Sequence, residues 1–245
     1  AVRLVELGEI TRQFNRMLDN MDVLIEQSYV SRLKEKESQL ISLQMQINPH
    51  FLYNTLEAIK WKAAATQSRQ DRDEVGEMIT SLSAMLRYSF REMEREVPLR
   101  EEIRQARHYL SLQSVRFPEK FRAFFMIGDD VEEAPVPKLI LQPRIENAIL
   151  HGFEDREKGG VIILYAQRDQ GELRLSVYDN GRGMPEDFPY EALDTLRSGR
   201  ISQFVGLRNV NERLMLKYDR NHALTIRSVP GKYTKVVIRI PLPEE

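Results

Sequence analysis

The stretch Leu139-Ile-Leu-Gln-Pro-Arg-Ile-Glu-Asn-Ala-Ile-Leu-His151 has the apolar spacing of a helix that packs on a core, and we expect a helix over residues 138–151. Ile145 can face that core, whereas Asn147 and His151, four residues apart, share another face. An amide oxygen at Asn147 can ligate Mg²⁺, which takes oxygen donors, and His151 could then reach a phosphate. The alternative is ordinary polarity on the surface of a helix.

A glycine-rich turn follows in the sequence Asp179-Asn-Gly-Arg-Gly-Met184, at the end of an expected strand. Gly181 and Gly183 permit positive φ angles and let a ligand approach the backbone closely. A buried carboxylate at Asp179 could accept a hydrogen bond from an exocyclic amine such as that of adenine. Glycine turns after strands are common, and this one fits neither the phosphate loop G-x-x-x-x-G-K-S/T nor the dinucleotide motif G-x-G-x-x-G.

Helices and strands are mixed through the chain beyond Pro98. Gly206 and Leu207 open one of the helices, whose N-terminal amides can hold phosphate. The apolar pattern predicts helices over 100–115 and 207–218, and strands over 121–127, 161–167, 172–178, 224–229 and 235–240. The expected fold class is therefore α+β, with one sheet layered on helices.

The first third of the chain has helical periodicity. Its apolar residues recur at alternating spacings of three and four, as in a heptad seam: Leu7, Ile10, Phe14, Met17, Met21 and Leu24. The seam can be a parallel coiled coil, which we favour, or one face of a bundle helix. Two further helical patterns, over 40–61 and 75–86, would form an antiparallel hairpin, which a dimer would double into a four-helix bundle.

His50 lies in the first of these two patterns, within Gln46-Ile-Asn-Pro-His-Phe-Leu-Tyr-Asn-Thr-Leu56. A lone histidine in a helix is more often structural than catalytic. Pro49 is expected to kink the helix beside the ring, and Asn54, one turn later, can bond or orient an imidazole nitrogen. A neutral imidazole is a competent nucleophile at pH 7, so His50 is a candidate acceptor group.

The composition excludes several classes of protein. With 36 Lys and Arg against 37 Asp and Glu, the chain of 245 residues is nearly neutral, which gives no reason to propose nucleic acid as its partner. The absence of cysteine excludes disulfide scaffolds, thiolate metal sites and cysteine nucleophiles. No apolar run reaches the ~18 residues that span a bilayer, so we expect no membrane-spanning segment in this sequence.

Taken in order, these segments resemble the sensor histidine kinases of the YesM/LytS type. QINPHFLYNTLEAI is similar to the phosphoacceptor motif, LILQPRIENAILHGFE to the N box, YDNGRGM to the first glycine box, GLRNVNERL to the part after the second, and PGKYTKVVIRIP to the closing hairpin. ELGEITRQFNRML resembles the last helix of a HAMP linker, which in the family follows a transmembrane segment. The resemblance covers nearly the whole chain.

The resemblance implies a Bergerat-type α/β sandwich that binds ATP, preceded by a helical coiled coil and a dimeric four-helix bundle. It implies three domains: residues 1–33 as the end of the HAMP linker and signalling helix, 34–97 as the dimerisation and histidine phosphotransfer hairpin, and 98–245 as the ATP-binding domain. The chain would then be the cytoplasmic portion of a bacterial cell-membrane protein.

The resemblance also implies roles for individual residues. His50 would be phosphorylated, with Asn54 as an orienting partner. Asn147 would hold Mg²⁺ and Asp179 would read adenine. Contacts with ATP are implied as well for His151, Gly181, Gly183, Gly206 and Leu207.

Three positions depart from related patterns. Pro143 stands where ATPases such as the gyrase, Hsp90 and MutL group have the glutamate that activates water, which favours transfer to histidine over hydrolysis. Phe51 stands where the most studied histidine kinases have an acidic residue, so no general base is assigned. Only Gly206 remains of the second glycine box, in Ser-Gln-Phe-Val-Gly-Leu at 202–207.

The predicted function is that of a sensor histidine kinase in a two-component system. In a homodimer, the γ-phosphoryl group of ATP, bound with Mg²⁺, passes to His50 and then to an aspartate in the receiver domain of a response regulator. One alternative is a catalytically weak nucleotide-binding dimer that relays conformation, which the altered second glycine box would suit. Another is an ATPase of the gyrase type, which Pro143 and the His50 motif disfavour.

Overall fold

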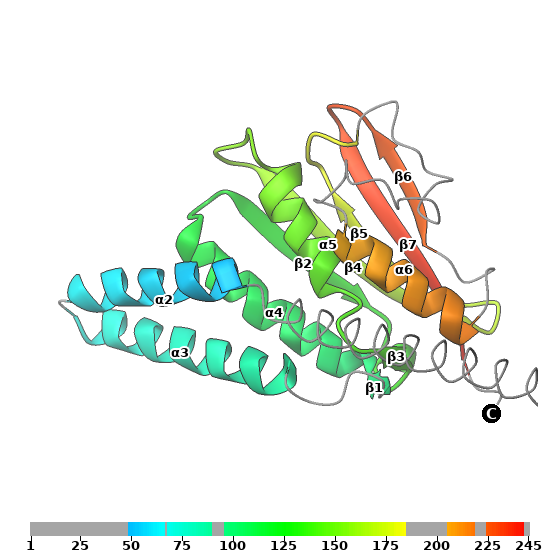
Figure 1. The fold of residues 1–245 in the computed structure, drawn as a ribbon, viewed down its shortest axis with the longest axis horizontal. Helices are drawn as coiled ribbons and strands as arrows, with labels where there is room; N and C mark the ends of the chain where they lie inside the picture. Colours follow the sequence, from blue (N-terminus) through cyan, green and yellow to red (C-terminus); the bar gives the residue numbers. More distant parts are fainter. Residues whose placement is uncertain (1–48, 67, 90–95, 185–204, 219–223, 243–245) are drawn as a thin grey trace, which may run out of the picture. The chain divides into compact units, whose positions relative to one another are not determined.

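The computed structural model describes residues 49–66, 68–89, 96–184, 205–218 and 224–242 (Figure 1). The chain divides into two compact units, Ala1–Leu52 and Tyr53–Glu245. The first unit contributes only the start of one helix to the described residues. The predicted seam at residues 7–24 and the bend expected just before Pro49 lie outside them, and the three domain boundaries stay predictions.

The described residues form helices and strands in the mixed order that the sequence predicts. The helices are α2 (Pro49–Ala64), α3 (Arg69–Ser89), α4 (Leu99–Arg116), η1 (Asp129–Val131), α5 (Gln142–Asn147), η2 (Ala148–Gly152) and α6 (Val205–Tyr218). The strands are β1 (Glu96–Pro98), β2 (Phe121–Ile127), β3 (Pro135–Pro137), β4 (Gly160–Asp169), β5 (Glu172–Asp179), β6 (Thr225–Val229) and β7 (Tyr233–Pro241).

Five of the strands form one sheet, in the order β2-β4-β5-β7-β6. β2 runs parallel to β4, and the other neighbours are antiparallel. β1 and β3 pair separately in an antiparallel ribbon. Both predicted hairpins, β4–β5 and β6–β7, are confirmed, because alternating apolar residues on either side of a short turn fix the pairing locally.

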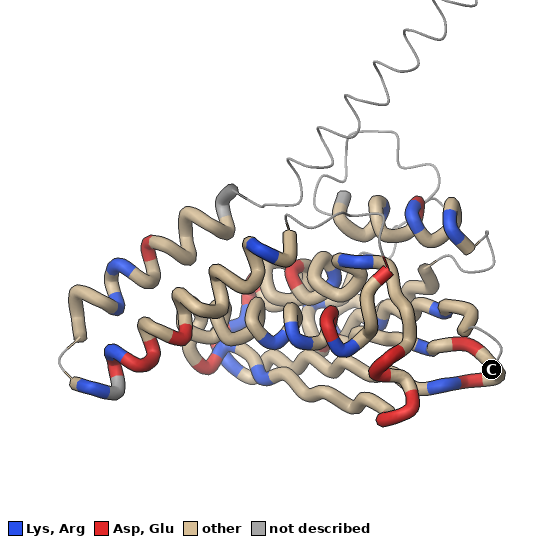
Figure 2. The backbone as a smooth tube through the Cα atoms, turned by 90° about the horizontal axis from the view of Figure 1, so that it is seen from below, with Lys and Arg blue, Asp and Glu red and all other residues tan. Residues whose placement is uncertain are grey.

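Helices α4, α5 and α6 lie on one face of this sheet, as the two views in Figures 1 and 2 agree. The side chains that point from the sheet toward these helices alternate along each strand and are buried: Ile162, Leu164, Ala166, Leu173, Leu175, Val177, Val236, Ile238 and Ile240. Ala106, Leu110, Ile145, Ile149, Val210 and Leu214 are buried residues of the three helices. The predicted α+β sandwich is therefore confirmed.

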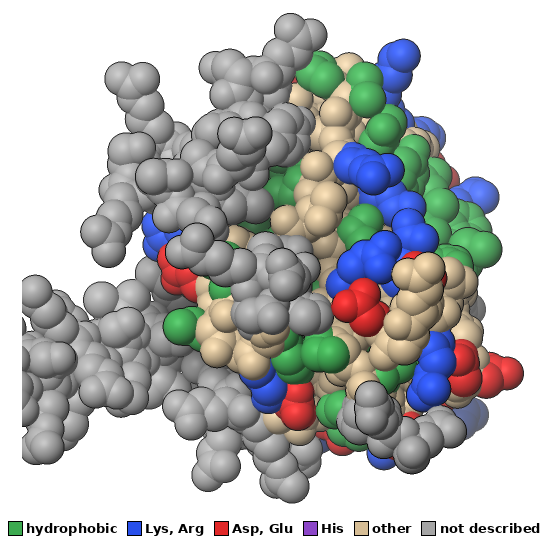
Figure 3. Space-filling model, turned by 90° about the vertical axis from the view of Figure 1, so that its right-hand side faces the viewer, with side chains coloured by type: hydrophobic (Ala, Val, Ile, Leu, Met, Phe, Trp, Pro, Cys, Tyr) green, Lys and Arg blue, Asp and Glu red, His purple; other side chains and the backbone are tan. Residues whose placement is uncertain are grey.

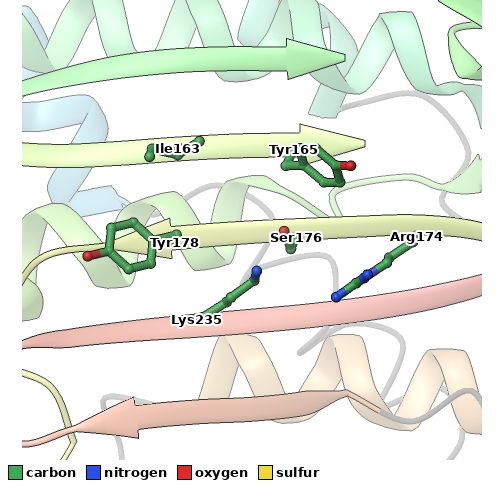
Figure 4. A pocket seen from close by; sticks show the side chains of 6 residues that line it. All are labelled: Ile163, Tyr165, Arg174, Ser176, Tyr178 and Lys235. Atoms are coloured by element: carbon green, nitrogen blue, oxygen red, sulfur yellow. The ribbon is translucent and has the colours of Figure 1, made fainter. Parts of the chain in front are cut away.

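No helix that the structure describes covers the opposite face of the sheet (Figures 1 and 2). Phe124 and Met126 on β2 are 50% and 57% exposed. A hollow of about 410 Å³ on this face is lined by Ile163, Tyr165, Arg174, Ser176, Tyr178 and Lys235, whose side chains come from three neighbouring strands (Figure 4). On the side of the molecule shown in Figure 3, Lys and Arg side chains gather next to hydrophobic ones.

The helix expected over 138–151 differs from the one observed. α5 begins only at Gln142, because Leu139 has a positive φ of 55° and the backbone N–H groups of Leu139, Ile140 and Leu141 donate to the carboxylate of Glu102 instead of entering a helix. After Asn147 the α-helix gives way to the π-helical turn η2, which ends at Gly152.

The second helical pattern is predicted over 75–86, but α3 already begins at Arg69. Ser68 and Asp71 explain the difference. The Ser68 hydroxyl accepts the N–H of Asp71 at 3.1 Å, and the Asp71 carboxylate accepts the N–H of Ser68 at 3.0 Å. This reciprocal pair is a capping box, which starts a helix even where apolar residues are missing.

Charges of both signs are interspersed along the described elements (Figure 2), in keeping with the near-neutral composition. Among the described residues, every helix is too short or too polar to cross a membrane.

Candidate functional site

A cavity of about 390 Å³ lies where β5 ends in the glycine turn. Its lining combines charged, polar and glycine residues from α5, η2, the turn after β5 and the β6–β7 hairpin: Arg144, Asn147, His151, Gly152, Asp179, Arg182, Gly183, Met184, Pro230 and Thr234. Four of the predicted site residues, Asn147, His151, Asp179 and Gly183, thus share one cavity.

Asp179 is the buried acid of this cavity, with a side chain that is 1% exposed. Its Oδ1 accepts the backbone N–H of Gly181 at 2.8 Å, and its Oδ2 forms an ion pair with Nη2 of Arg144. The sequence predicted the burial of Asp179 but not its cationic partner. The carboxylate remains able to accept a further hydrogen bond, because each oxygen has two lone pairs.

The position two residues after Asp179 has to be glycine, because there is no space for a side chain. A Cβ on Gly181 would lie 2.5 Å from both Asp179 Oδ1 and the carbonyl oxygen of Gly152. Gly183 has a φ of 73°, and a Cβ there would lie 2.4 Å from the carbonyl oxygen of Val229. The glycine turn therefore holds the backbone close to the acid on one side and to the β6–β7 hairpin on the other.

Asn147 and His151 come from the end of α5 and from η2. Nδ2 of Asn147 is buried and has no hydrogen-bond partner among the described residues, although Asn147 lines the cavity. Burial lowers the pKa of His151 below its usual value; the nearby charge of Arg182 lowers it further, and Glu154 opposes the shift. The net shift favours the neutral form of the imidazole.

A magnesium ion fits this donor set only as a partly hydrated ion. No group of three or more His, Cys, Asp and Glu residues in the described ranges could enclose a metal. The side-chain carbonyl oxygen of Asn147 would be its protein ligand, and phosphate oxygens and water would complete the shell, as is usual for Mg²⁺.

Gly206 and Leu207 lie in the first turn of α6 and do not line the cavity. Leu207 is buried, 2% exposed, and a Cβ on Gly206 would lie 3.0 Å from Cβ of Pro143. The start of α6 therefore lies close to α5 at Pro143. The segment between the glycine turn and α6, 185–204, lies outside the described residues.

His50 is the second residue of α2, and Asn54 lies one turn later on the same helix. Nδ2 of Asn54 is buried and has no hydrogen-bond partner in the described ranges of the chain. Asn54 lines a groove of about 700 Å³ together with residues of α2, α3 and the end of α4, among them Trp61, Asp71 and Arg116. Asn54 is thus not among the residues that line the cavity around Asp179.

Several residues near the cavity were missed from the sequence. Arg144 lies four residues after Ile140 and four before Ala148, both buried, so its place on the apolar side of α5 was a signal. Glu102 lies on the same helical face as Leu99 and Ala106, and it too is buried. Arg182 and Thr234 carried no comparable signal, because their positions depend on the pairing of distant strands.

Two family models match the chain. The model described as "Histidine kinase" matches residues 38–121, which contain His50 and Asn54. The model described as "Histidine kinase-, DNA gyrase B-, and HSP90-like ATPase" matches residues 134–244, which contain every residue that lines the cavity.

Curated relatives extend the match to nearly the whole chain. "Sensor histidine kinase YesM" of Bacillus subtilis (strain 168) is 36% identical over 245 residues, covering 98% of this chain and 40% of the relative. "Sensor protein LytS" of Enterococcus faecalis is 28% identical, covering 86% of this chain and 35% of the relative. The chain thus spans less than half the length of these relatives.

A solved structure is matched more loosely. The histidine kinase domain from the blue-light activated histidine kinase of Erythrobacter litoralis EL346 has a TM-score of 0.44 at 20% identity, over 86% of this chain and 94% of that one. At that TM-score the two chains differ too much for a residue-by-residue comparison.

Proposed function

Because this chain belongs to the sensor histidine kinases of the YesM/LytS type, we propose that it binds ATP with Mg²⁺ and transfers the γ-phosphoryl group to His50. The observation that carries the proposal is the cavity at the end of β5, which gathers Asn147, His151 and Asp179 within the residues matched to the ATPase family. The chain spans less than half the length of its relatives, so the activity named for those complete relatives comes to it only as part of this proposal.

In the proposed complex, Asp179 accepts a hydrogen bond from the exocyclic amine of adenine. Asn147 holds Mg²⁺, which would neutralise charge on the phosphates and help to orient them. His151 and the guanidinium of Arg182, which pairs with Glu154 at 2.9 Å, supply polar and cationic groups to the phosphate end. The amides at the start of α6 are a further place for phosphate oxygens.

The transfer itself needs a nucleophile and a leaving group in line. A neutral nitrogen of His50 attacks the γ-phosphorus, the bond from that phosphorus to the β–γ bridging oxygen breaks, and ADP leaves. The N–P bond forms while the ring becomes positively charged, and the proton on the other ring nitrogen then passes to solvent. Asn54, one turn after His50, is proposed to orient the ring.

Hydrolysis is disfavoured by the side chain at position 143. A proline cannot deprotonate water, because its side chain has no group that accepts a proton. Histidine is therefore the expected acceptor.

Two partners belong to the proposal. A second copy of the chain would cover apolar side chains of the α2–α3 hairpin that are at least half exposed: Tyr53, Leu56, Trp61 and Ile79. A response regulator would take the phosphoryl group from His50 onto an aspartate. The resemblance of residues 6–18 to a HAMP exit helix supports a cytoplasmic location beside a membrane-anchored segment.

The test is incubation of the chain with γ-labelled ATP and Mg²⁺. We expect label on the protein that is stable in base and lost in acid, as phosphohistidine is. His50→Gln should abolish the label while ATP affinity stays within about twofold, and Asn147→Asp should lower labelling sharply. His108→Gln is the matched control, because His108 lies on α4, where Nδ1 bonds the hydroxyl of Ser81 at 3.1 Å.

The same experiment separates the alternatives. Full labelling of His50→Gln would refute the acceptor assignment. Steady phosphate release without protein label would favour the ATPase, and ATP binding with neither label nor release would favour a nucleotide-binding relay.

A further inference from the structure

The guanidinium of Arg144 lies at the proposed base-reading end of the cavity. Its side chain is only 4% exposed, yet it lines the cavity together with Asp179 and Thr234. Nη2 pairs with the Asp179 carboxylate and donates to the carbonyl oxygen of Thr234 at 3.3 Å. Nε is buried without a partner among the described residues. A buried guanidinium whose other terminal nitrogen, Nη1, takes part in neither of these two contacts therefore lies in the site beside the acid.

A lone carboxylate is selective because it only accepts hydrogen bonds. It can pair with the 6-amino group of adenine, whereas it repels the 6-oxo group of guanine or hypoxanthine in the same pose. If Asp179 were the only group at this end, the oxygen at position 6 of a 6-oxo purine would face the carboxylate, acceptor against acceptor. A site with such a mismatch binds adenine much more tightly than 6-oxo purines.

The pair of Arg144 and Asp179 offers a donor and an acceptor side by side. Adenine presents a donor at its 6-amino group and an acceptor at N1, so the amine can bond Asp179 while N1 accepts from Arg144. Guanine and hypoxanthine present the reverse order, an acceptor at O6 and a donor at N1–H. Arg144 can then donate to O6 while Asp179 accepts from N1–H, after a shift of the base by about one atom. Arginine is a common partner of this purine oxygen.

We propose that Arg144 is a second base-reading residue, and that it makes this nucleotide site accept 6-oxo purine nucleotides as well as ATP. The inference rests on the proposed function, since it assumes that Asp179 faces the base. Arg144 would contact the base directly, through N–H groups that Asp179 and Thr234 do not use.

The experiment measures binding rather than phosphoryl transfer. ATP, GTP and ITP are titrated with Mg²⁺ against a fluorescent ATP analogue on the parent chain, and the ratio of dissociation constants for GTP and ATP is the readout. We expect GTP and ITP to bind within about tenfold of ATP. In Arg144→Leu, the GTP to ATP ratio should rise at least tenfold, because O6 then faces only the acid.

Two further variants serve as a conservative substitution and as a control. Arg144→Leu leaves Asp179 without its cation and could unfold, so Arg144→Lys is measured in parallel; it keeps the charge but loses the planar fork, and its ratio should also rise. Arg122→Leu, an exposed position on β2, is the control and should leave the ratio unchanged.

Each outcome bears on the inference. Parent chain that binds ATP and rejects GTP by more than about a hundredfold would overturn it while leaving the proposed function intact. An unchanged ratio in both Arg144 variants would also overturn it, since Arg144 would then only balance the charge of Asp179. Failure of the parent to bind either nucleotide would refute the proposed function, and this inference with it.

Discussion

The carboxylate of Glu102 accepts the backbone N–H of Leu139, with 2.7 Å between oxygen and nitrogen. The same carboxylate accepts the N–H groups of Ile140 and Leu141 at 2.9 and 3.2 Å and the hydroxyl of Tyr88 at the end of α3. One buried acid on α4 thus joins the α3 helix to the segment that leads into α5. The position of Asn147 and Arg144 therefore depends on a residue outside the cavity.

We expect Glu102→Gln to destabilise the chain. The carboxylate shares four donors between two oxygens, and a glutamine offers a single oxygen, while its NH₂ group would face backbone N–H groups. The unfolding free energy should fall by about 1.5–3 kcal/mol, measured by denaturant titration. Glu157→Gln, an exposed position, should change it by less than about 0.5 kcal/mol. Equal stability of the two variants would mean that the Glu102 contacts contribute nothing.

The ion pair between Arg144 and Asp179 predicts strong coupling between two substitutions. Asp179→Asn leaves a buried guanidinium without an anion, and Arg144→Leu leaves a buried carboxylate without a cation. Each should lower the unfolding free energy by about 3–5 kcal/mol. The double variant Arg144→Leu/Asp179→Asn should lose less than the sum of the two, because neither buried charge remains. Additive losses in a double-mutant cycle would show that the two side chains do not interact.

Substitution of Asp179 should also weaken ATP binding by about tenfold to a hundredfold, since one hydrogen bond to a charged acceptor is lost. The double variant Arg144→Leu/Asp179→Asn lacks the same hydrogen bond but should be less destabilised, so its ATP affinity shows whether the loss of binding comes from the missing bond or from unfolding. If the double variant is stable and still binds ATP as the parent does, Asp179 does not read the base.

The lowered pKa of His151 predicts a pH dependence of nucleotide affinity. In the free protein, burial lowers the pKa of His151, the charge of Glu154 opposes this shift and that of Arg182 adds to it. The folded state therefore binds fewer protons than the unfolded state just below pH 6.5. A phosphate beside the ring would favour its protonated form and raise its pKa. Affinity for ATP should therefore increase as the pH falls from 7.5 toward 5.5, by at most about tenfold per pH unit, the limit for one proton.

The control for this prediction is His151→Gln, which cannot gain the proton. ATP itself titrates in the same range, so the quantity to compare is the ratio of the two affinities at each pH. The affinity of the parent for ATP, divided by that of His151→Gln, should increase as the pH falls. A ratio that is constant over this range would mean that His151 is remote from the phosphates.

Local sequence patterns predicted the strands of the sheet well. Contacts between side chains far apart in the sequence could not be predicted. The two strands around Gly171 are predictable because apolar and polar residues alternate on both sides of a turn, all within about twenty residues. β4 and β5 therefore appear where they are expected. The ion pair of Arg144 and Asp179 joins positions 35 apart, and the bond of Glu102 to Leu139 joins positions 37 apart. Neither partner reveals the other, because a charged residue on a helix is exposed far more often than buried.

The observed start of α5 has the same cause. The apolar pattern continues back to Leu139 and predicts helix there, but the carboxylate of Glu102 binds the N–H groups of that segment and keeps Leu139 at positive φ. Tertiary contacts override local propensity in this case. The π-helical turn η2 is likewise absent from any local pattern, and it ends where Gly152 meets Asp179 and Gly181.

The last prediction concerns the contact between the glycine turn and the β6–β7 hairpin. Gly183 and Gly231 have the same φ of 73°, but a Cβ on Gly231 meets nothing within 4 Å, whereas one on Gly183 would lie 2.4 Å from the carbonyl oxygen of Val229. Gly231→Ala should therefore show backbone strain alone, about 1–2 kcal/mol of unfolding free energy. Gly183→Ala should lose that amount and about 1–3 kcal/mol more for the steric conflict.

The two variants should also differ in nucleotide binding. Gly183 lines the cavity beside Pro230, so relief of the conflict has to move the glycine turn or the hairpin, and either shift changes the shape of the site. ATP affinity should fall in Gly183→Ala and stay within about twofold of the parent in Gly231→Ala. Because both substitutions strain the backbone equally, equal ATP affinity in the two folded variants would show that the hairpin contact plays no part in shaping the cavity.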